Sequence, residues 1–175
     1  MSSHDQEDDT ISLLLVQRLK MEWKLAKANN ADKDRLFTLM FDPDNKLYWY
    51  ALIRGISDDY ESGQYLISIK LSTGYPAKSP VVRWLTPQGR FEVDTPICLN
   101  ITSYHSDTNN VAWRLISIVQ ALISMLFEYQ PGIGAINPED SRASSEAKRK
   151  FALESADYNL KHNSEIVDRC NLALQ

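Results

Sequence analysis

Four short apolar segments follow one another in this 175-residue chain and constrain its fold more than any other feature. They span residues 36–41, 47–55, 64–72 and 81–85. The pieces between them are short and rich in Pro, Asp, Asn, Ser and Gly, which is typical of turns. Because neighbouring parallel strands need a long crossover connection, these segments predict sequential strands in an antiparallel sheet.

The third segment alternates apolar and polar residues most clearly. Its apolar set is Tyr65, Ile67, Ile69 and Leu71, and its polar set is Ser68, Lys70 and Ser72. Alternation of this kind places the apolar side chains on one face of a strand. It predicts a half-buried sheet with a helix covering one face.

Helices are predicted before and after the strands. Residues 11–29 carry apolar side chains at helical spacing, and residues 113–128 are apolar around most of the circumference, which predicts a central, buried helix. Residues 137–140 have the sequence Asn-Pro-Glu-Asp, typical of a helix start, and residues 144–164 are expected to be helical. The predicted class is α/β (α+β): an N-terminal helix, a four-stranded antiparallel sheet, a central helix and C-terminal helices.

The acidic residues are unevenly distributed. The chain has 19 Lys and Arg against 23 Asp and Glu, and Asp5, Glu7, Asp8 and Asp9 account for the net charge of −4. The remainder is neutral overall, which argues against a nucleic-acid partner because nucleic-acid binding needs a basic surface. Residues 1–10 are predicted to be a disordered acidic tail, and residues 11–175 a single domain.

The residues themselves predict neither a metal site nor a membrane span. Two cysteines, Cys98 and Cys170, and three histidines show no paired metal-ligand spacing. The apolar runs are shorter than the about 20 residues that span a bilayer. The chain is therefore expected to be cytoplasmic.

The predicted first helix carries basic residues between its apolar ones: Arg18, Lys20, Lys24 and Lys27. Two interpretations stay open. The first is a solvated face on a helix that packs against the core. The second is a docking surface for an acidic partner.

Cys98 is the candidate nucleophile. It lies within residues 86–112, a stretch with turn chemistry and little periodicity, and long ordered loops of this kind are often functional. Its Ile-Cys-Leu context is also typical of a buried, unreactive thiol. His105 follows, so a cysteine–histidine hydrolase is an alternative, although the spacing identifies no residue to orient the histidine.

Five motifs, in order and at matching spacing, resemble those of ubiquitin-conjugating enzymes. They are residues 48–55, 60–65, Tyr75-Pro76 with Pro80, 86–91 and 97–99. The chain is most similar to the J-type branch, which is anchored in the endoplasmic reticulum (ER), through residues 86–91, 98–101 and 105–108. The likeness covers residues 11–163 and implies the ubiquitin-conjugating (UBC) fold for a single catalytic core domain.

This resemblance implies that Cys98 accepts ubiquitin as a thioester and transfers it to a lysine or hydroxyl of a protein substrate. It implies as partners ubiquitin, the ubiquitin-activating enzyme, a ubiquitin ligase of the RING type and the substrate. No cofactor is implied, because the activating enzyme consumes the ATP. It also implies a role in ER-associated degradation, at the cytosolic face of the ER membrane if an anchor follows Gln175.

Further candidates near Cys98 follow from the same resemblance. Gln88 occupies the position of an Asn that, in most of the family, supports this loop and the oxyanion of the tetrahedral intermediate. Gln keeps the amide donor on a longer side chain, so a role limited to tying down the loop is equally open. Asp107 is a candidate for orienting an incoming lysine, and His105 for deprotonating a hydroxyl acceptor. Both are also ordinary loop residues.

Two loops depart from the family on the surface that contacts ligases. Ala77 stands where many members have a large apolar residue, and Asn109 and Val111 replace a Trp and a Pro. Loss of an apolar anchor weakens an interface. An alternative function is therefore a catalytically weak variant that binds ubiquitin or a ligase as a scaffold.

Overall fold

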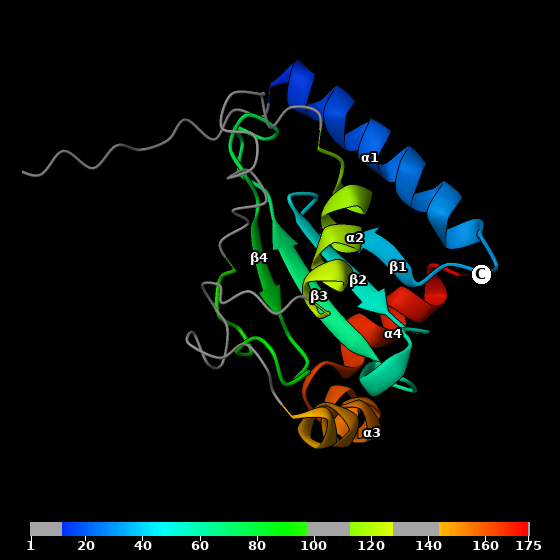
Figure 1. Ribbon diagram of the computed structural model, residues 1–175. Coiled ribbons are helices and arrows are strands. Elements are labelled where there is room, and N and C mark those ends of the chain that lie inside the picture. Colours follow the sequence, from blue (N-terminus) through cyan, green and yellow to red (C-terminus); the bar gives the residue numbers. More distant parts are fainter. Residues whose placement is uncertain (1–11, 98–112, 128–143, 175) are drawn as a thin grey trace, which may run out of the picture.

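The computed structural model describes residues 12–97, 113–127 and 144–174. In chain order the elements are α1 (Leu13–Ala31), β1 (Phe37–Phe41), β2 (Tyr48–Ile53), the 3-10 helix η1 (Asp58–Tyr60), β3 (Tyr65–Lys70), β4 (Val81–Trp84), α2 (Leu115–Met125), α3 (Ser145–His162) and α4 (Ser164–Leu172). The strands form one antiparallel sheet in the order β1-β2-β3-β4 (Figure 1). The predicted fold class is therefore confirmed.

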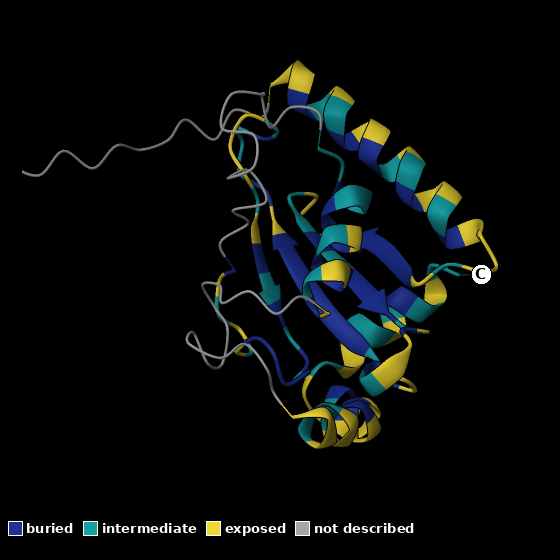
Figure 2. Ribbon diagram, in the orientation of Figure 1, coloured by how far each residue is buried: buried dark blue, intermediate teal, exposed yellow. Residues whose placement is uncertain are grey.

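The helix α1 begins at a side-chain cap and buries one stripe. Ser12 Oγ accepts a hydrogen bond from the backbone N–H of Leu15 at 3.1 Å, which satisfies one of the donors left free in a first helical turn. The buried residues of α1 recur at helical spacing, at Leu15, Leu19, Glu22, Ala26 and Asn30. Figure 2 shows the consequence, a buried inner side and an exposed outer side along the helix.

The main core lies between α2 and one face of the sheet. Ile67 and Ile69 of β3 and Leu122 of α2 are fully buried there, and α1 closes the core with Leu15 and Leu19. In Figure 1, α2 lies in front of the sheet and α1 runs beside both. The prediction of a central, buried helix is confirmed, with bounds slightly inside those expected.

Part of the opposite face of the sheet is also covered, which corrects the expectation that this face is solvated throughout. Leu66, whose side chain points away from Ile67 and the main core, is fully buried in a second cluster with Met40, Leu52 and Cys170 of α4. Ser68, expected on a polar face, is only 9% exposed. The physical reason is α4, which packs its apolar residues against β1 and β2.

Side-chain hydrogen bonds attach α3 to the end of the sheet. Ser155 Oγ accepts from the backbone N–H of Gln64 at 2.8 Å, and Asn159 Nδ2 donates to the carbonyl of the same residue at 2.8 Å.

Among the helices that the structure describes, none is long and apolar enough to cross a membrane.

Both outer strands have partners along their outer edges. On β1, Asn30 Nδ2 donates to the carbonyl of Leu39 at 2.9 Å, and Asn30 Oδ1 accepts from the Leu39 N–H at 2.9 Å. On β4, the N–H of Ile97 donates to the carbonyl of Val82 at 2.9 Å. A side chain of α1 and the segment after β4 thus take the place of further strands.

Candidate active site

The segment that leads from β4 to Cys98 is anchored by Gln88. Gln88 Oε1 accepts from the backbone N–H groups of Arg90 at 2.6 Å and Phe91 at 2.9 Å, and Gln88 Nε2 donates to the carbonyl of Phe91 at 2.9 Å. The side chain is 0% exposed. Gly89 adopts φ +85, which favours glycine, so the turn bends back over the amide of Gln88.

Thr86 fixes the start of the same segment. Its hydroxyl accepts from the N–H of Leu66 at 2.9 Å and donates to Asn159 Oδ1 at 2.6 Å, so β3, the segment and α3 meet at one oxygen. Phe91 stacks on Trp84, with ring centroids 6.3 Å apart and planes 7° apart. Hydrogen bonds and ring packing therefore hold this segment at several points.

The end of the segment pairs with β4. The N–H of Asp94 donates to the carbonyl of Trp84 at 2.8 Å, and Ile97 pairs with Val82. The backbone is thus held at the residue immediately before Cys98. Cys98, His105, Asp107, Asn109 and Val111 themselves lie outside the described residues.

Two roles are predicted for Gln88, support of its loop and stabilisation of an oxyanion. Its hydrogen bonds to the described residues all go to the backbone of its own loop, as support of that loop requires. An amide nitrogen has two N–H donors, and one of them is used on Phe91. The role at an oxyanion stays a prediction.

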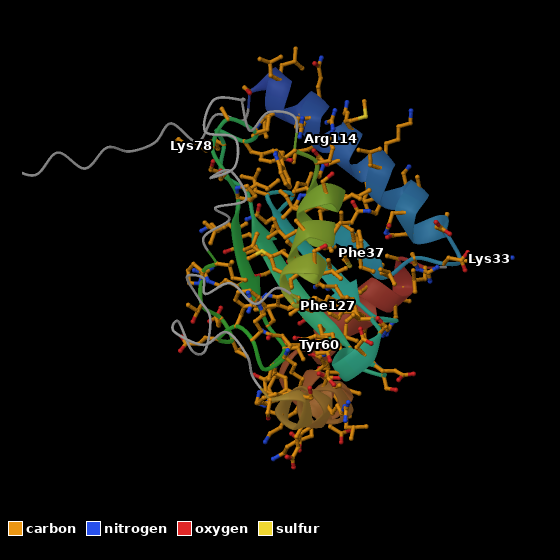
Figure 3. The ribbon with its side chains drawn as sticks, in the orientation of Figure 1. Lys33, Phe37, Tyr60, Lys78, Arg114 and Phe127 are labelled. Carbon is orange, nitrogen blue, oxygen red and sulfur yellow. The ribbon has the colours of Figure 1, made fainter. Side chains whose placement is uncertain are left out.

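A buried carboxylate, Glu22, joins α1 to two loops and was not found by sequence reasoning. Glu22 Oε1 accepts from the Tyr75 hydroxyl at 2.9 Å, and Glu22 Oε2 accepts from the backbone N–H of Leu115 at 3.1 Å. Arg18 Nε lies 2.7 Å from Glu22 Oε1, and Arg114 Nη1 lies 3.7 Å from it. Figure 3 labels Arg114 where α2 begins, close to α1. A usable signal existed, because Glu22 falls on the same helical stripe as Leu15, Leu19 and Ala26.

Arg18 belongs to this internal network, which corrects its expected place on an exposed basic face. Its side chain is 11% exposed, its guanidinium lies 5.2 Å from the centroid of the Tyr75 ring, and it also donates to the carbonyl of Trp113. The reason is the buried carboxylate of Glu22, whose negative charge Arg18 compensates. The exposed basic face of α1 consists of Lys20, Lys24 and Lys27.

An apolar groove of about 490 Å³ runs beside this face. Leu19 and Trp23 form its α1 side, and residues 43–47, between β1 and β2, form the other. Trp23 packs edge-on against Phe41, with ring centroids 4.9 Å apart. The groove therefore combines an aromatic floor with a lysine, Lys20, at its edge.

The structure describes the loop around Ala77, which the resemblance predicts to face ligases. Tyr75 is buried against Glu22, while Ala77 is exposed. Burial raises the pKa of the Tyr75 hydroxyl strongly, so this hydroxyl stays a hydrogen-bond donor.

The described residues contain no group of His, Cys, Asp and Glu side chains that could hold a metal ion.

A family model for ubiquitin-conjugating enzymes matches residues 18–158. The chain belongs to the ubiquitin-conjugating enzyme family. It is 37% identical over 117 residues to ubiquitin-conjugating enzyme E2 6 of Eremothecium gossypii, covering 66% of this chain and 46% of that relative. It is 37% identical over 120 residues to ubiquitin-conjugating enzyme E2 J2 of Homo sapiens, covering 68% and 44%. The resemblance to the J-type branch is confirmed.

These curated relatives are longer than this chain, which spans less than half of their length. A solved structure assigned to the same family, from Plasmodium yoelii, superposes with a TM-score of 0.57 at 16% sequence identity. The superposition covers 84% of this chain and 94% of that structure. It supports the UBC fold.

Proposed function

We propose that this chain is an active ubiquitin-conjugating enzyme that carries ubiquitin as a thioester on Cys98. The observation that carries the proposal is the anchored segment before this cysteine, which Thr86, Gln88 and the pairing of Ile97 with β4 hold in place. A nucleophile that exchanges a bulky protein among several partners needs a fixed backbone and an accessible position. Family membership supplies the reaction class.

The proposed chemistry is acyl transfer in two steps. The Cys98 thiolate attacks the carbonyl carbon of the ubiquitin thioester on the activating enzyme, and the thiolate of that enzyme leaves. An acceptor amine or hydroxyl then attacks the same carbon, and the Cys98 thiolate leaves. In this proposal Gln88 supports the loop, and Asp107 and His105 orient or deprotonate the acceptor.

The proposed docking surface for the activating enzyme is the exposed lysine face of α1 and the adjoining groove. Lys20, Lys24 and Lys27 are exposed on one helix, and positive charge of this kind steers an acidic partner. The groove beside them has apolar walls, including Leu19 and Trp23. An acidic domain with an apolar anchor fits this combination.

The proposed cellular role is ER-associated degradation with a RING-type ligase, at the cytosolic face of the ER membrane. Its support is the likeness to the J-type branch, because among the curated relatives is an enzyme named E2 J2. The exposed Ala77, in place of a large apolar residue, sets this chain apart in ligase choice.

The decisive experiment mixes the protein with activating enzyme, ATP and ubiquitin, and separates the products without reductant. The expected result is an adduct of one ubiquitin that a thiol reductant removes and that Cys98→Ala abolishes. Cys170→Ala is the matched control, because Cys170 is buried in the α4 cluster and should leave the adduct intact.

Two other outcomes would support the other functions. Ubiquitin binding that is unchanged in Cys98→Ala, with no reducible adduct, would favour a scaffold. Cleavage of a ubiquitin ester without ATP or activating enzyme would favour a Cys98–His105 hydrolase. Either result would overturn the carrier proposal.

A further inference from the structure

A small basic cavity lies at the far edge of the sheet from the Cys98 segment. It has a volume of about 120 Å³ and is bounded by the α1–β1 connection, by β1 and the end of β2, and by Leu174. Of its eight lining residues three are basic, Lys33, Arg35 and Arg54, and none is acidic. Figure 3 labels Lys33 on the connection that follows α1.

Neutral partners hold Arg54 in place without compensating its charge. Arg54 Nη2 donates to Gln64 Oε1 at 3.1 Å and to Asn171 Oδ1 at 3.1 Å, and both acceptors are side-chain amides. Its Nη1 and Nε have no hydrogen-bond partner among residues 12–97, 113–127 and 144–174. The half-buried guanidinium of Arg54 is therefore oriented through Nη2, and its Nη1 and Nε donors remain available to a ligand.

The groups around Arg54 leave its positive charge in place. Burial and the nearby positive charge of Arg35 lower the pKa of Arg54, but an arginine stays charged at neutral pH. Burial raises the pKa of the neighbouring Cys170 thiol to about 12, so this thiol is neutral. The acids nearest in sequence to Lys33 and Arg35, Asp32 and Asp34, do not line the cavity.

Arg35 is likewise fixed by a neutral group. Its Nη1 donates to the backbone carbonyl of Asp32 at 2.7 Å. The Asp32 carboxylate accepts from the N–H of Asp34 at 3.0 Å, within the same connection. Two guanidinium groups therefore share one cavity, and neither has an ion-pair partner among the described residues.

We propose that the cavity formed by Lys33, Arg35 and Arg54 is a binding site for a single phosphate group. Arginine pairs with phosphate through parallel N–H···O bonds, and Arg54 keeps the donors for such a pair. The volume of about 120 Å³ is well below that of a pocket for a drug-sized ligand, so the site takes the phosphate and not a bulky group attached to it. The phosphate can come from the free anion or from the headgroup of an acidic phospholipid.

The test is a titration of the protein with inorganic phosphate, followed by the backbone amide signals in NMR at constant ionic strength. Saturable shifts are expected at Leu36, Phe37 and Leu174, which line the cavity. Arg35→Gln and Arg54→Gln should each weaken binding at least about tenfold, since hydrogen bonds to charged groups are the stronger ones. Arg35→Gln guards against loss of folding, because the one hydrogen bond that Arg35 makes to a described residue is local.

The matched control is Lys161→Gln, which removes an exposed positive charge from α3 and should leave phosphate binding unchanged. Formation of the Cys98 adduct should stay at the level of the unsubstituted protein in both arginine variants. Shifts that grow linearly with phosphate, or that chloride reproduces, would overturn the proposal. Equal phosphate binding by the unsubstituted protein and both variants would overturn it as well.

A second arm distinguishes the two sources of phosphate. The protein is floated with vesicles of phosphatidylcholine alone or with phosphatidic acid added. Recovery with the acidic vesicles only, lost in Arg35→Gln and Arg54→Gln but not in Lys161→Gln, identifies the headgroup. Binding of the free anion with no vesicle recovery identifies a soluble ligand. Absence of both would refute the site.

Discussion

Glu22 Oε2 accepts a hydrogen bond from the backbone N–H of Leu115 at 3.1 Å, so a side chain of α1 caps the first turn of α2. The N-terminal end of a helix has free N–H groups and partial positive charge, and a carboxylate there stabilises both. The same carboxylate accepts from Tyr75. One buried residue therefore fixes the first helix, the loop that contains Tyr75 and the central helix relative to one another.

Glu22→Ala is expected to lower the free energy of unfolding by about 3–5 kcal/mol, because it leaves Arg18 largely buried without its carboxylate. Urea denaturation measures this. The control is Glu154→Ala, which breaks an exposed pair with Lys150 and should change stability by less than about 0.5 kcal/mol. Equal effects of the two substitutions would contradict the role given to Glu22.

Gln88→Ala is expected to lower the free energy of unfolding by about 1–3 kcal/mol, because the backbone N–H groups of Arg90 and Phe91 lose their acceptor. Discharge of ubiquitin from Cys98 to free lysine should slow in the same variant. Thermal denaturation and single-turnover discharge, measured side by side, separate the two effects. Full stability combined with a hundredfold slower discharge would argue against loop support and for the oxyanion role.

Replacement of Lys20, Lys24 and Lys27 by Glu is expected to slow charging by the activating enzyme by about tenfold or more at low salt. The difference should shrink as salt screens the charges. Initial rates of adduct formation at several salt concentrations provide the measurement. Lys150→Glu with Lys161→Glu on α3 is the control, and a similar loss there would show that total charge matters rather than the α1 face.

Cys170 is expected to resist thiol reagents in the folded protein, because burial raises its pKa to about 12. Cys98→Ala leaves Cys170 as the only cysteine of the chain. A coloured disulfide reagent at pH 8 should detect no thiol in the native variant and one thiol after denaturation in guanidinium. Rapid reaction in the native state would indicate that α4 detaches from the sheet.

Ala77→Phe is expected to strengthen binding to RING-type ligases by about tenfold, because an exposed aromatic residue supplies a missing anchor. Ligase-stimulated discharge of the Cys98 adduct measures the gain, and the rate without ligase should not change. Lys70→Phe, at an exposed site at the end of β3, is the control for non-specific adhesion. An equal gain in both variants would contradict a specific contact.

The sheet was predictable from sequence because its strands are joined by short, turn-rich connections. The cover on its second face was not, because Leu66 is flanked by residues of the main core and polar alternation nearby suggested a solvated face. The partner that buries Leu66 is α4, about a hundred residues later in the chain. Patterns within one strand do not report such distant partners.

The candidate site was predictable only in part. The loop position of Gln88 followed from the resemblance, whereas its hydrogen bonds depend on the turn at Gly89. Arg18 was assigned to a basic face by charge alone, and its burial follows from Glu22 on the next turn. A charged side chain on a helix can be exposed to solvent or buried beside an opposite charge. Only its position relative to the stripe of buried residues distinguishes these two cases.

The pairing of both outer strands also matters for solubility. The side chain of Asn30 hydrogen-bonds the backbone N–H and carbonyl of Leu39 on β1. The N–H of Ile97 donates to the carbonyl of Val82 on β4. Free strand edges are templates on which another chain can add a strand and begin aggregation. The segment that leads to Cys98 therefore also protects the outer edge of β4, so a substitution that loosens this segment would also promote self-association.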